Sequence, residues 1–126
     1  MRAIDTNVLV CILTRDDPKQ VRVADDFLAA GAWVSLLALA ETIWILTTVY
    51  TRDAAEIGAS LDQLLNHKDL ILQDREVVAA ALEIFRARPA LGFTDCLLLE
   101  VARKAGHLPL GTFDRNLSKV DDAEKL

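Results

Sequence analysis

Four acidic residues in this sequence, Asp5, Glu41, Asp95 and Asp114, lie where a carboxylate is costly or where strand ends bring carboxylates together. Asp5 and Asp114 each follow a short apolar run that predicts a strand. If those strands are parallel, their carboxyl ends meet at one edge of the sheet, where open α/β sheets bind ligands. Glu41 stands inside an apolar helix without a nearby Lys or Arg, and a buried carboxylate needs a partner. Together the four acids predict a cation site.

The chemistry of this acid cluster follows from its ligand type. No His or Cys accompanies the four acids, and hard oxygen ligands suit Mg²⁺, with Mn²⁺ as a substitute, better than zinc. A cation held in this way activates water and stabilises the leaving oxygen, so we expect hydrolysis of a phosphodiester bond. Ordinary structural explanations also exist, because Asp5 is a suitable helix cap or turn former and Asp95 a suitable helix cap, with Thr94 as a rival.

The elements that must position these acids alternate between strand and helix. This alternation predicts an α/β fold, a three-layer α/β/α sandwich with a central, mostly parallel sheet of four to five strands. Strands are expected at residues 1–5, 32–34, 69–73 and 109–112. Helices are expected at residues 8–13 (capped by Thr6 or Asn7), 18–30 (capped by Asp16 or Asp17), 36–50 (capped by Ser35), 52–67, 75–88 and 93–104.

Two expectations concern burial and order. The helix over residues 36–50 is apolar nearly all round, which predicts that it is largely buried and that Trp44, like Trp33, belongs to the core. The tail from Ser118 to Leu126 is polar and acidic, and it carries too little apolar surface to order itself. We therefore expect this tail to be loose or to pack late.

Composition narrows the class of protein. A chain of 126 residues suits a single domain over 1–126, and the net charge of −5 argues against nucleic-acid binding by bulk positive charge. Cys11 and Cys96 lie in apolar surroundings at no metal-ligand spacing, which favours small buried hydrophobes in a reducing cytosol. The first residues do not form a signal peptide, so we expect a cytoplasmic protein.

At these motifs the sequence resembles the PIN-domain ribonucleases. The resemblance is carried by residues 3–9 (Ala-Ile-Asp-Thr-Asn-Val-Leu), Glu41, residues 94–98 (Thr-Asp-Cys-Leu-Leu) and residues 111–114 (Gly-Thr-Phe-Asp), in that order. The single-domain length resembles the VapC toxins of bacterial type II toxin–antitoxin pairs. One departure is the end after Leu117, which is more polar than the family's usual final strand.

The resemblance implies a Mg²⁺-dependent endoribonuclease that acts on single-stranded or looped RNA, such as tRNA or rRNA loops. It implies metal binding by Asp5 and Asp95, completion of the acidic site by Glu41 and Asp114, a homodimer, and a cognate antitoxin that blocks the site. It also implies supporting roles for Thr6, Asn7 and Thr112. Basic residues near the acids are candidates for a grip on the RNA phosphates, although each also suits a solvated helix face: Arg15, Arg86, Arg88 and Arg115.

Two other protein classes fit the sequence less well, and one non-enzyme alternative remains open. Haloacid-dehalogenase-type phosphatases also begin with a strand that ends in Asp, but they need a second Asp where Asn7 stands. Receiver domains have a similar size, but they need paired acids and a Lys on a late strand. The non-enzyme alternative is a catalytically inactive PIN fold that serves as an RNA-binding or protein-interaction module. A buried Glu41 would argue against that module, because an apolar replacement would stabilise it.

Overall fold

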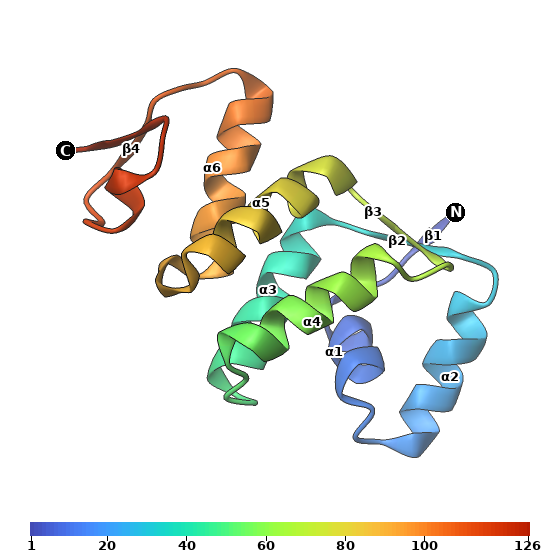
Figure 1. Ribbon diagram of the computed structural model, residues 1–126. Helices are drawn as coiled ribbons and strands as arrows, with labels where there is room; N and C mark the ends of the chain where they lie inside the picture. Colours follow the sequence, from blue (N-terminus) through green and yellow to red (C-terminus); the bar gives the residue numbers. More distant parts are fainter. The chain divides into compact units, whose positions relative to one another are not determined.

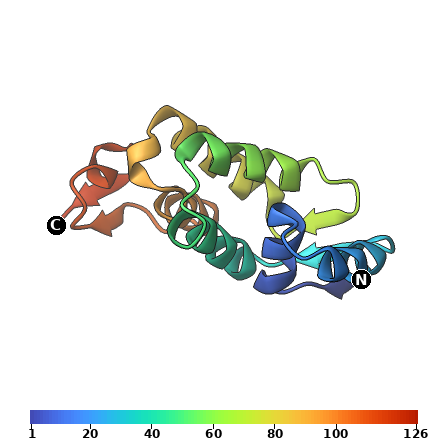
Figure 2. The same cartoon turned by 90° about the horizontal axis from the view of Figure 1, so that it is seen from below.

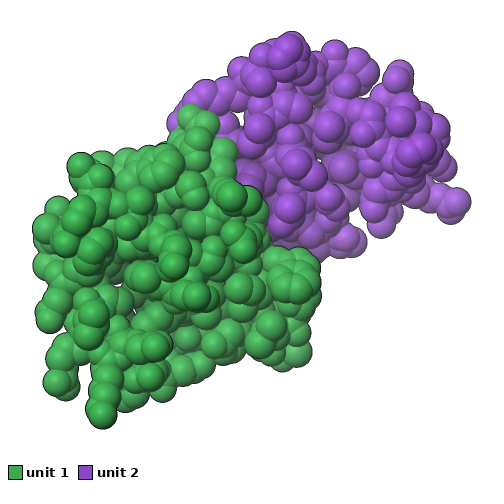
Figure 3. Space-filling view, turned by 180° about the vertical axis from the view of Figure 1, so that it is seen from behind, with its two compact units in different colours: residues 1–75 green, residues 76–126 purple.

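The computed structural model describes residues 1–126, and its chain divides into two compact units, Met1–Arg75 and Glu76–Leu126 (Figure 3). The α/β class is confirmed, because helices alternate with five strands and every strand pair is parallel. The expected strands are divided between two sheets, one of three strands in the order β1-β2-β3 and one formed by β4 and β5.

The first unit is built on the three-stranded sheet (Figure 1). Because neighbouring strands are parallel, the chain crosses over through a pair of helices each time it returns to the sheet. The amide of Ile4 extends the β1–β2 pairing by donating to the Trp33 carbonyl at 3.1 Å. The elements in chain order are β1 (Arg2–Ala3), α1 (Thr6–Thr14), α2 (Pro18–Leu28), β2 (Ala32–Val34), α3 (Leu36–Thr48), α4 (Ala54–Leu65) and β3 (Leu70–Leu72).

Local capping explains where several helices of the first unit begin. Asp17 accepts from the amides of Lys19 and Gln20 at the start of α2, and Ser35 accepts from the Ala38 amide at the start of α3, both as expected. The α1 cap differs from the expectation. Asp5, and not Thr6 or Asn7, caps this helix, because its carboxylate accepts the Val8 amide three residues on.

The expectation that α3 is buried all round was wrong. Buried residues on one face of α3 pack against α1 and the rest of the first unit, whereas Leu37, Glu41 and Trp44 are exposed. Position on the helix decides this outcome, because residues three and four apart share a face and only one face of α3 packs against the rest of the unit. The buried α3 residues are Ala38, Leu39, Thr42, Ile43 and Leu46.

The second unit contains two α-helices and the two-stranded sheet (Figures 1 and 2). The rings of Phe85 on α5 and Phe93 on α6 pack edge to face with their centroids 6.2 Å apart. The elements in chain order are α5 (Arg75–Ala87), whose first residue closes the first unit, the 3₁₀ turn η1 (Pro89–Leu91), α6 (Phe93–Ala105), β4 (Leu110–Thr112), the 3₁₀ turn η2 (Leu117–Lys119) and β5 (Ala123–Lys125).

The acidic tail is ordered, which corrects the expectation that it is loose. β5 pairs with β4 in a parallel register that sets Gly111 opposite Glu124. Leu117 is buried, and the side chain of Leu126 lies against Gly111, where a Cβ would meet it at 3.4 Å. Backbone pairing and two leucines therefore order a segment whose polar composition argued for disorder.

Both cysteines are free thiols, and Cys96 is fully buried. Burial raises the pKa of Cys96 to about 11, so at pH 8 this group stays a thiol and is a poor nucleophile. We expect iodoacetamide to leave Cys96 unmodified in the native protein at pH 8 and to modify it in denaturant, as peptide mass spectrometry would report. Rapid native modification of Cys96 would contradict this burial.

No helix of the chain has both the length and the continuous apolar character needed to span a lipid bilayer.

Candidate functional site

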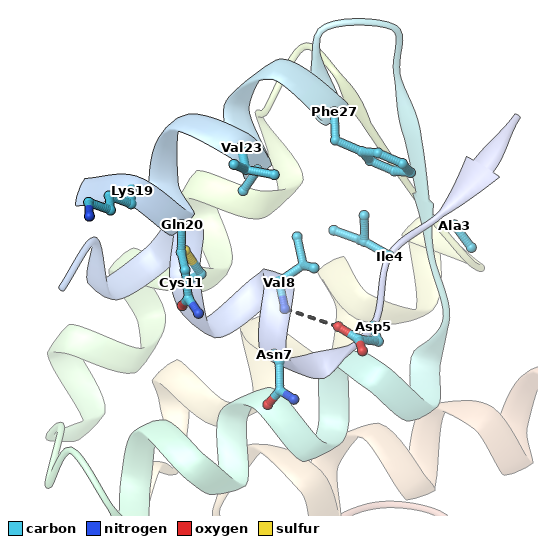
Figure 4. A pocket seen from close by; sticks show the side chains of 11 residues that line it. Ala3, Ile4, Asp5, Asn7, Val8, Cys11, Lys19, Gln20, Val23 and Phe27 are labelled. Carbon is cyan, nitrogen blue, oxygen red and sulfur yellow. Dashed lines mark hydrogen bonds between the residues drawn. The ribbon is translucent and has the colours of Figure 1, made fainter. Parts of the chain in front are cut away.

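Asp5 lies at the point where the first strand gives way to the first helix. Its Oδ1 accepts the Val8 amide at 3.1 Å, and the side chain is otherwise exposed, with Oδ2 engaged in no hydrogen bond (Figure 4). The structural explanation for Asp5 therefore holds, but it uses one carboxylate oxygen only. Thr6 begins α1, and Asn7 is exposed in the first turn of this helix. Both residues directly follow Asp5 in the sequence.

An open groove of about 640 Å³ lies beside Asp5, between α1 and α2 (Figure 4). Ile4, Val8 and Val23 form apolar parts of its wall, and Lys19 contributes a charged group. Phe27 also lines the groove, and the guanidinium of Arg2 packs 3.7 Å from its ring centroid. The surroundings of Asp5 are thus mostly apolar, and they do not form a basic cradle for phosphate.

Glu41 departs most from the sequence-based expectation. The prediction that it is buried without a partner was wrong, because its side chain is exposed on α3. An exposed glutamate keeps its hydration, so no metal is needed to explain its place in the helix. Glu41 remains a candidate ligand because its carboxylate is accessible and makes no ion pair.

Asp95 occupies the first turn of α6 without capping it. The helix begins at Phe93 with Gly92 as its N-cap, and no side chain accepts a hydrogen bond there, so neither Asp95 nor Thr94 serves as the cap. Gly92 adopts a φ of 76°, a conformation that residues with a side chain rarely adopt. The half-buried Asp95 carboxylate makes no hydrogen bond and no ion pair in the second unit.

The electrostatics of Asp95 are unusual for a surface acid. Burial raises the pKa of Asp95, and the negative charge of Asp114 raises it further. Two carboxylates therefore lie within electrostatic reach of each other in the second unit, and no cation of that unit pairs with either. A bound cation would offset both the burial of the Asp95 charge and the repulsion from Asp114.

Asp114 follows β4 and is held by its own turn. Its amide donates to the Thr112 hydroxyl at 2.9 Å, and its Oδ1 accepts the Leu117 amide at 2.8 Å. These two bonds fix the direction of the exposed carboxylate while leaving its second oxygen free. Thr112 therefore has the positioning contact that a supporting residue needs.

The four candidate arginines have different surroundings. Arg15 ends α1, at the opposite end from Asp5, and its guanidinium pairs with Asp25 at 2.9 Å. Arg86 lies in the last turn of α5, and Arg88 precedes η1 beside the acidic Glu83 and Glu100. Arg115 is exposed directly after Asp114, so it is the arginine placed next to a candidate acid.

The placement of the four acids divides them between the units. Asp5 and Glu41 belong to the first unit, and Asp95 and Asp114 belong to the second. Within either unit, no three Asp, Glu, His or Cys side chains gather closely enough to hold a metal ion by themselves. The donor chemistry still fits a hard divalent cation, because every candidate ligand is a carboxylate and each keeps at least one oxygen free of hydrogen bonds.

The expectation that Trp44 belongs to the core was wrong, and sequence reasoning did not single out Phe113 as an exposed aromatic residue. Trp44 follows Glu41 by three residues on α3, and Phe113 directly precedes Asp114. Both are among the exposed large hydrophobic residues of the chain. The spacing of Leu37, Glu41 and Trp44 was the available signal, since it places all three on one helix face.

Comparison with known proteins identifies one family. No curated protein and no solved structure matches the chain. The model of the PIN domain family matches residues 3–123, a range that runs through both units and includes all four acids. Proteins with this domain are generally metal-dependent nucleases. Because the match covers nearly the whole chain, this protein belongs to the PIN domain family.

Proposed function

We propose that this protein is a metal-dependent endoribonuclease whose acidic site comprises Asp5, Glu41, Asp95 and Asp114. Membership of a family of nucleases supports the reaction class. The observation that carries the proposal is the Asp95–Asp114 pair. The negative charge of Asp114 adds to the raised pKa of the half-buried Asp95, and neither carboxylate has a cationic partner. Carboxylate pairs of this kind are characteristic of sites that hold divalent cations.

In the proposed site, Asp5 and Asp95 hold the cation, and Glu41 and Asp114 complete the acidic set. Mg²⁺ is the proposed ion, with Mn²⁺ as a substitute, because all donors are hard oxygens. When bound, such a cation acidifies water and offsets the charge that develops on the phosphate. That all four acids act on one phosphodiester is a prediction from their order in the sequence.

The residues around the acids have narrower proposed roles. The Thr112 hydroxyl holds the main chain at Asp114, and Thr6 and Asn7 support Asp5 from the first turn of α1. Arg115 is proposed to contact a phosphate of the RNA, since it is exposed beside Asp114. Arg86 and Arg88 remain candidates for such contacts, and so does Arg15, whose guanidinium pairs with Asp25.

The biological role we propose is that of a VapC-like toxin held silent by a cognate antitoxin and forming a homodimer. The match to the PIN domain family and the order of the four acids in the sequence support this proposal. A small open reading frame immediately upstream that encodes a DNA-binding protein would support it. Growth arrest on expression of the present protein, relieved by co-expression of that upstream protein, would also support it. Expression that leaves growth and cellular RNA unchanged would contradict the toxin role.

The proposed activity is tested by incubating purified protein with total cellular RNA and Mg²⁺ or Mn²⁺, beside an EDTA control. We expect discrete fragments that disappear when EDTA removes the metal, because in the proposed site a bound cation activates the attacking water. Mapping the fragment ends would show whether cleavage falls in tRNA or rRNA loops. Cleavage that persists in EDTA, or no cleavage across several RNA classes, would contradict the proposal.

The alternative is a catalytically inactive PIN fold that binds RNA or another protein. The exposure of Glu41 favours this alternative in one respect, because an exposed glutamate costs little stability and its presence then needs no catalytic reason. The Asp95–Asp114 pair argues the other way, since a module without a metal would gain stability by replacing the half-buried Asp95. RNA binding without cleavage in Mg²⁺ or Mn²⁺ would establish the module.

A further inference from the structure

The exposed face of α3 combines an acid with large apolar side chains. Leu37 is 72% exposed and Trp44 is 63% exposed, and Glu41 lies between them on the same face. Tryptophan is highly buried on average in folded proteins, so an exposure of this size is uncommon. The Cβ atoms of residues three and four apart on a helix are about 5–6 Å apart, so Trp44 and Glu41 are neighbours on this face of α3.

The ring of Trp44 is not used by the fold. Its carbonyl accepts the Thr48 hydroxyl, but its indole N–H donates to no group of the chain. The aromatic and cation–π contacts of the protein involve other rings, those of Phe27, Phe85 and Phe93. Trp44 therefore presents a π surface and a free donor to whatever binds beside Glu41.

Charge narrows the kind of ligand contact that this face can make. The chain carries a net charge of −5, and α3 contains no Lys or Arg. Counterion release by basic residues, the usual source of affinity for nucleic acids, is therefore weak on this face. Stacking of bases on aromatic side chains is the other general contribution to affinity for single strands, worth about 1–3 kcal/mol per base.

We propose that Trp44 is a stacking platform for an unpaired base of single-stranded RNA, placed next to the phosphate on which Glu41 acts. This inference rests on the proposed nuclease function, and it assigns part of the substrate affinity to α3. The second unit contains a comparable pair, because Phe113 is 81% exposed and directly precedes Asp114. An exposed aromatic side chain thus accompanies one candidate acid in each unit.

Binding is measured first, in EDTA, so that no cleavage occurs. A fluorescein-labelled oligouridylate is titrated with protein and its anisotropy is followed, with an abasic oligonucleotide of the same length as a second probe. We expect Trp44→Ala to raise the Kd for oligouridylate about tenfold, which corresponds to about 1.4 kcal/mol and lies within the range of one stacked base. Trp44→Phe should recover most of the affinity. The abasic probe should bind the wild type and Trp44→Ala equally weakly.

Intrinsic fluorescence gives a direct readout of the indole. In a Trp33→Phe background, where Trp44 is the remaining tryptophan, oligouridylate should quench the emission and the abasic probe should not. The matched control is Leu37→Ala, which removes an equally exposed apolar side chain from the same face without removing a π surface. This control should change the Kd less than about twofold, because stacking requires an aromatic ring.

The two proposals fail in different ways. If wild-type protein cleaves RNA and Trp44→Ala leaves both Kd and KM unchanged, the stacking role is overturned and the nuclease stands. If the protein never cleaves RNA but oligouridylate quenches Trp44, the nuclease fails and the stacking role stands. If Trp44→Ala converts a dimer into a monomer on size exclusion and Leu37→Ala does the same, the face binds a second copy and the stacking role is overturned.

In the nuclease itself, stacking predicts an effect on KM rather than on kcat. A base that stacks equally in the ground state and the transition state adds uniform binding, whose loss raises KM and leaves kcat nearly unchanged. A fall in kcat at constant KM in the Trp44→Ala variant would instead indicate that the substitution disturbs Glu41.

Discussion

An Asp95→Asn variant is expected to lose RNA cleavage by more than about 100-fold while unfolding at the same or a slightly higher temperature than the metal-free wild type. The loss follows because removing even an outer partner of a metal ligand costs about 10–100-fold, and Asp95 is proposed as a ligand itself. The gain in stability follows because Asn replaces a half-buried carboxylate whose pKa is raised by burial and by Asp114.

The stability difference should depend on pH in a defined direction. Since the folded-state pKa of Asp95 lies above its unfolded value, the protonated acid contributes stability that is fully present below the unfolded pKa and lost as the pH rises through the raised value. The two proteins should therefore unfold at similar temperatures at low pH and diverge toward neutrality. Because Asp95 is partly exposed, screening keeps this divergence below about 4 °C.

Thermal unfolding with added Mn²⁺ or Mg²⁺ separates metal binding from activity. A cation that binds only the folded state raises the unfolding temperature of the wild type in proportion to its occupancy, and this rise should vanish in Asp95→Asn. Asp121→Asn is the matched control, because Asp121 is an exposed acid of the same unit with no proposed role. An equal metal response in Asp95→Asn and wild type would exclude Asp95 as a ligand.

At Asp5 two substitutions should separate catalysis from capping. Asp5→Asn and Asp5→Ala are both expected to lose cleavage by more than about 100-fold, since each removes a charged ligand. Their stabilities should differ, because Asn is as good a helix cap as Asp, whereas Ala leaves the Val8 amide unpaired at a cost of about 1 kcal/mol. Urea unfolding would measure this difference. Full cleavage by Asp5→Asn would remove Asp5 from the site, and equal stability of the two variants would contradict the capping contact.

The sequence by itself determined the features that depend on neighbouring residues. Asp17 and Ser35 cap helices where their spacing to unpaired amides predicted it, and Gly106 takes the left-handed conformation that ends α6. The alternation of strand and helix likewise predicted parallel pairing. The caps rest on interactions between residues a few positions apart, so they can be deduced without knowing how the chain folds back.

Competition between nearby caps could not be decided from the sequence. Three consecutive residues are all good caps: Asp5, Thr6 and Asn7. The first helical residue depends on where β1 ends. Asp95 and Thr94 looked like caps, but α6 starts at Phe93 after the positive φ of Gly92, which places Asp95 inside the first turn. Asp95, which has no capping role, is one of the two proposed cation ligands.

Only the tertiary structure decided which faces are buried and how distant segments pair. The apolar sequence of α3 predicted burial on all sides, yet packing fills one face and leaves Glu41 and Trp44 exposed. The polar tail predicted disorder, yet β5 pairs with β4 through backbone hydrogen bonds that any side chains permit. Burial and strand pairing depend on which distant segments of the chain pack against a given helix or strand. The residue types of that helix or strand do not specify those segments.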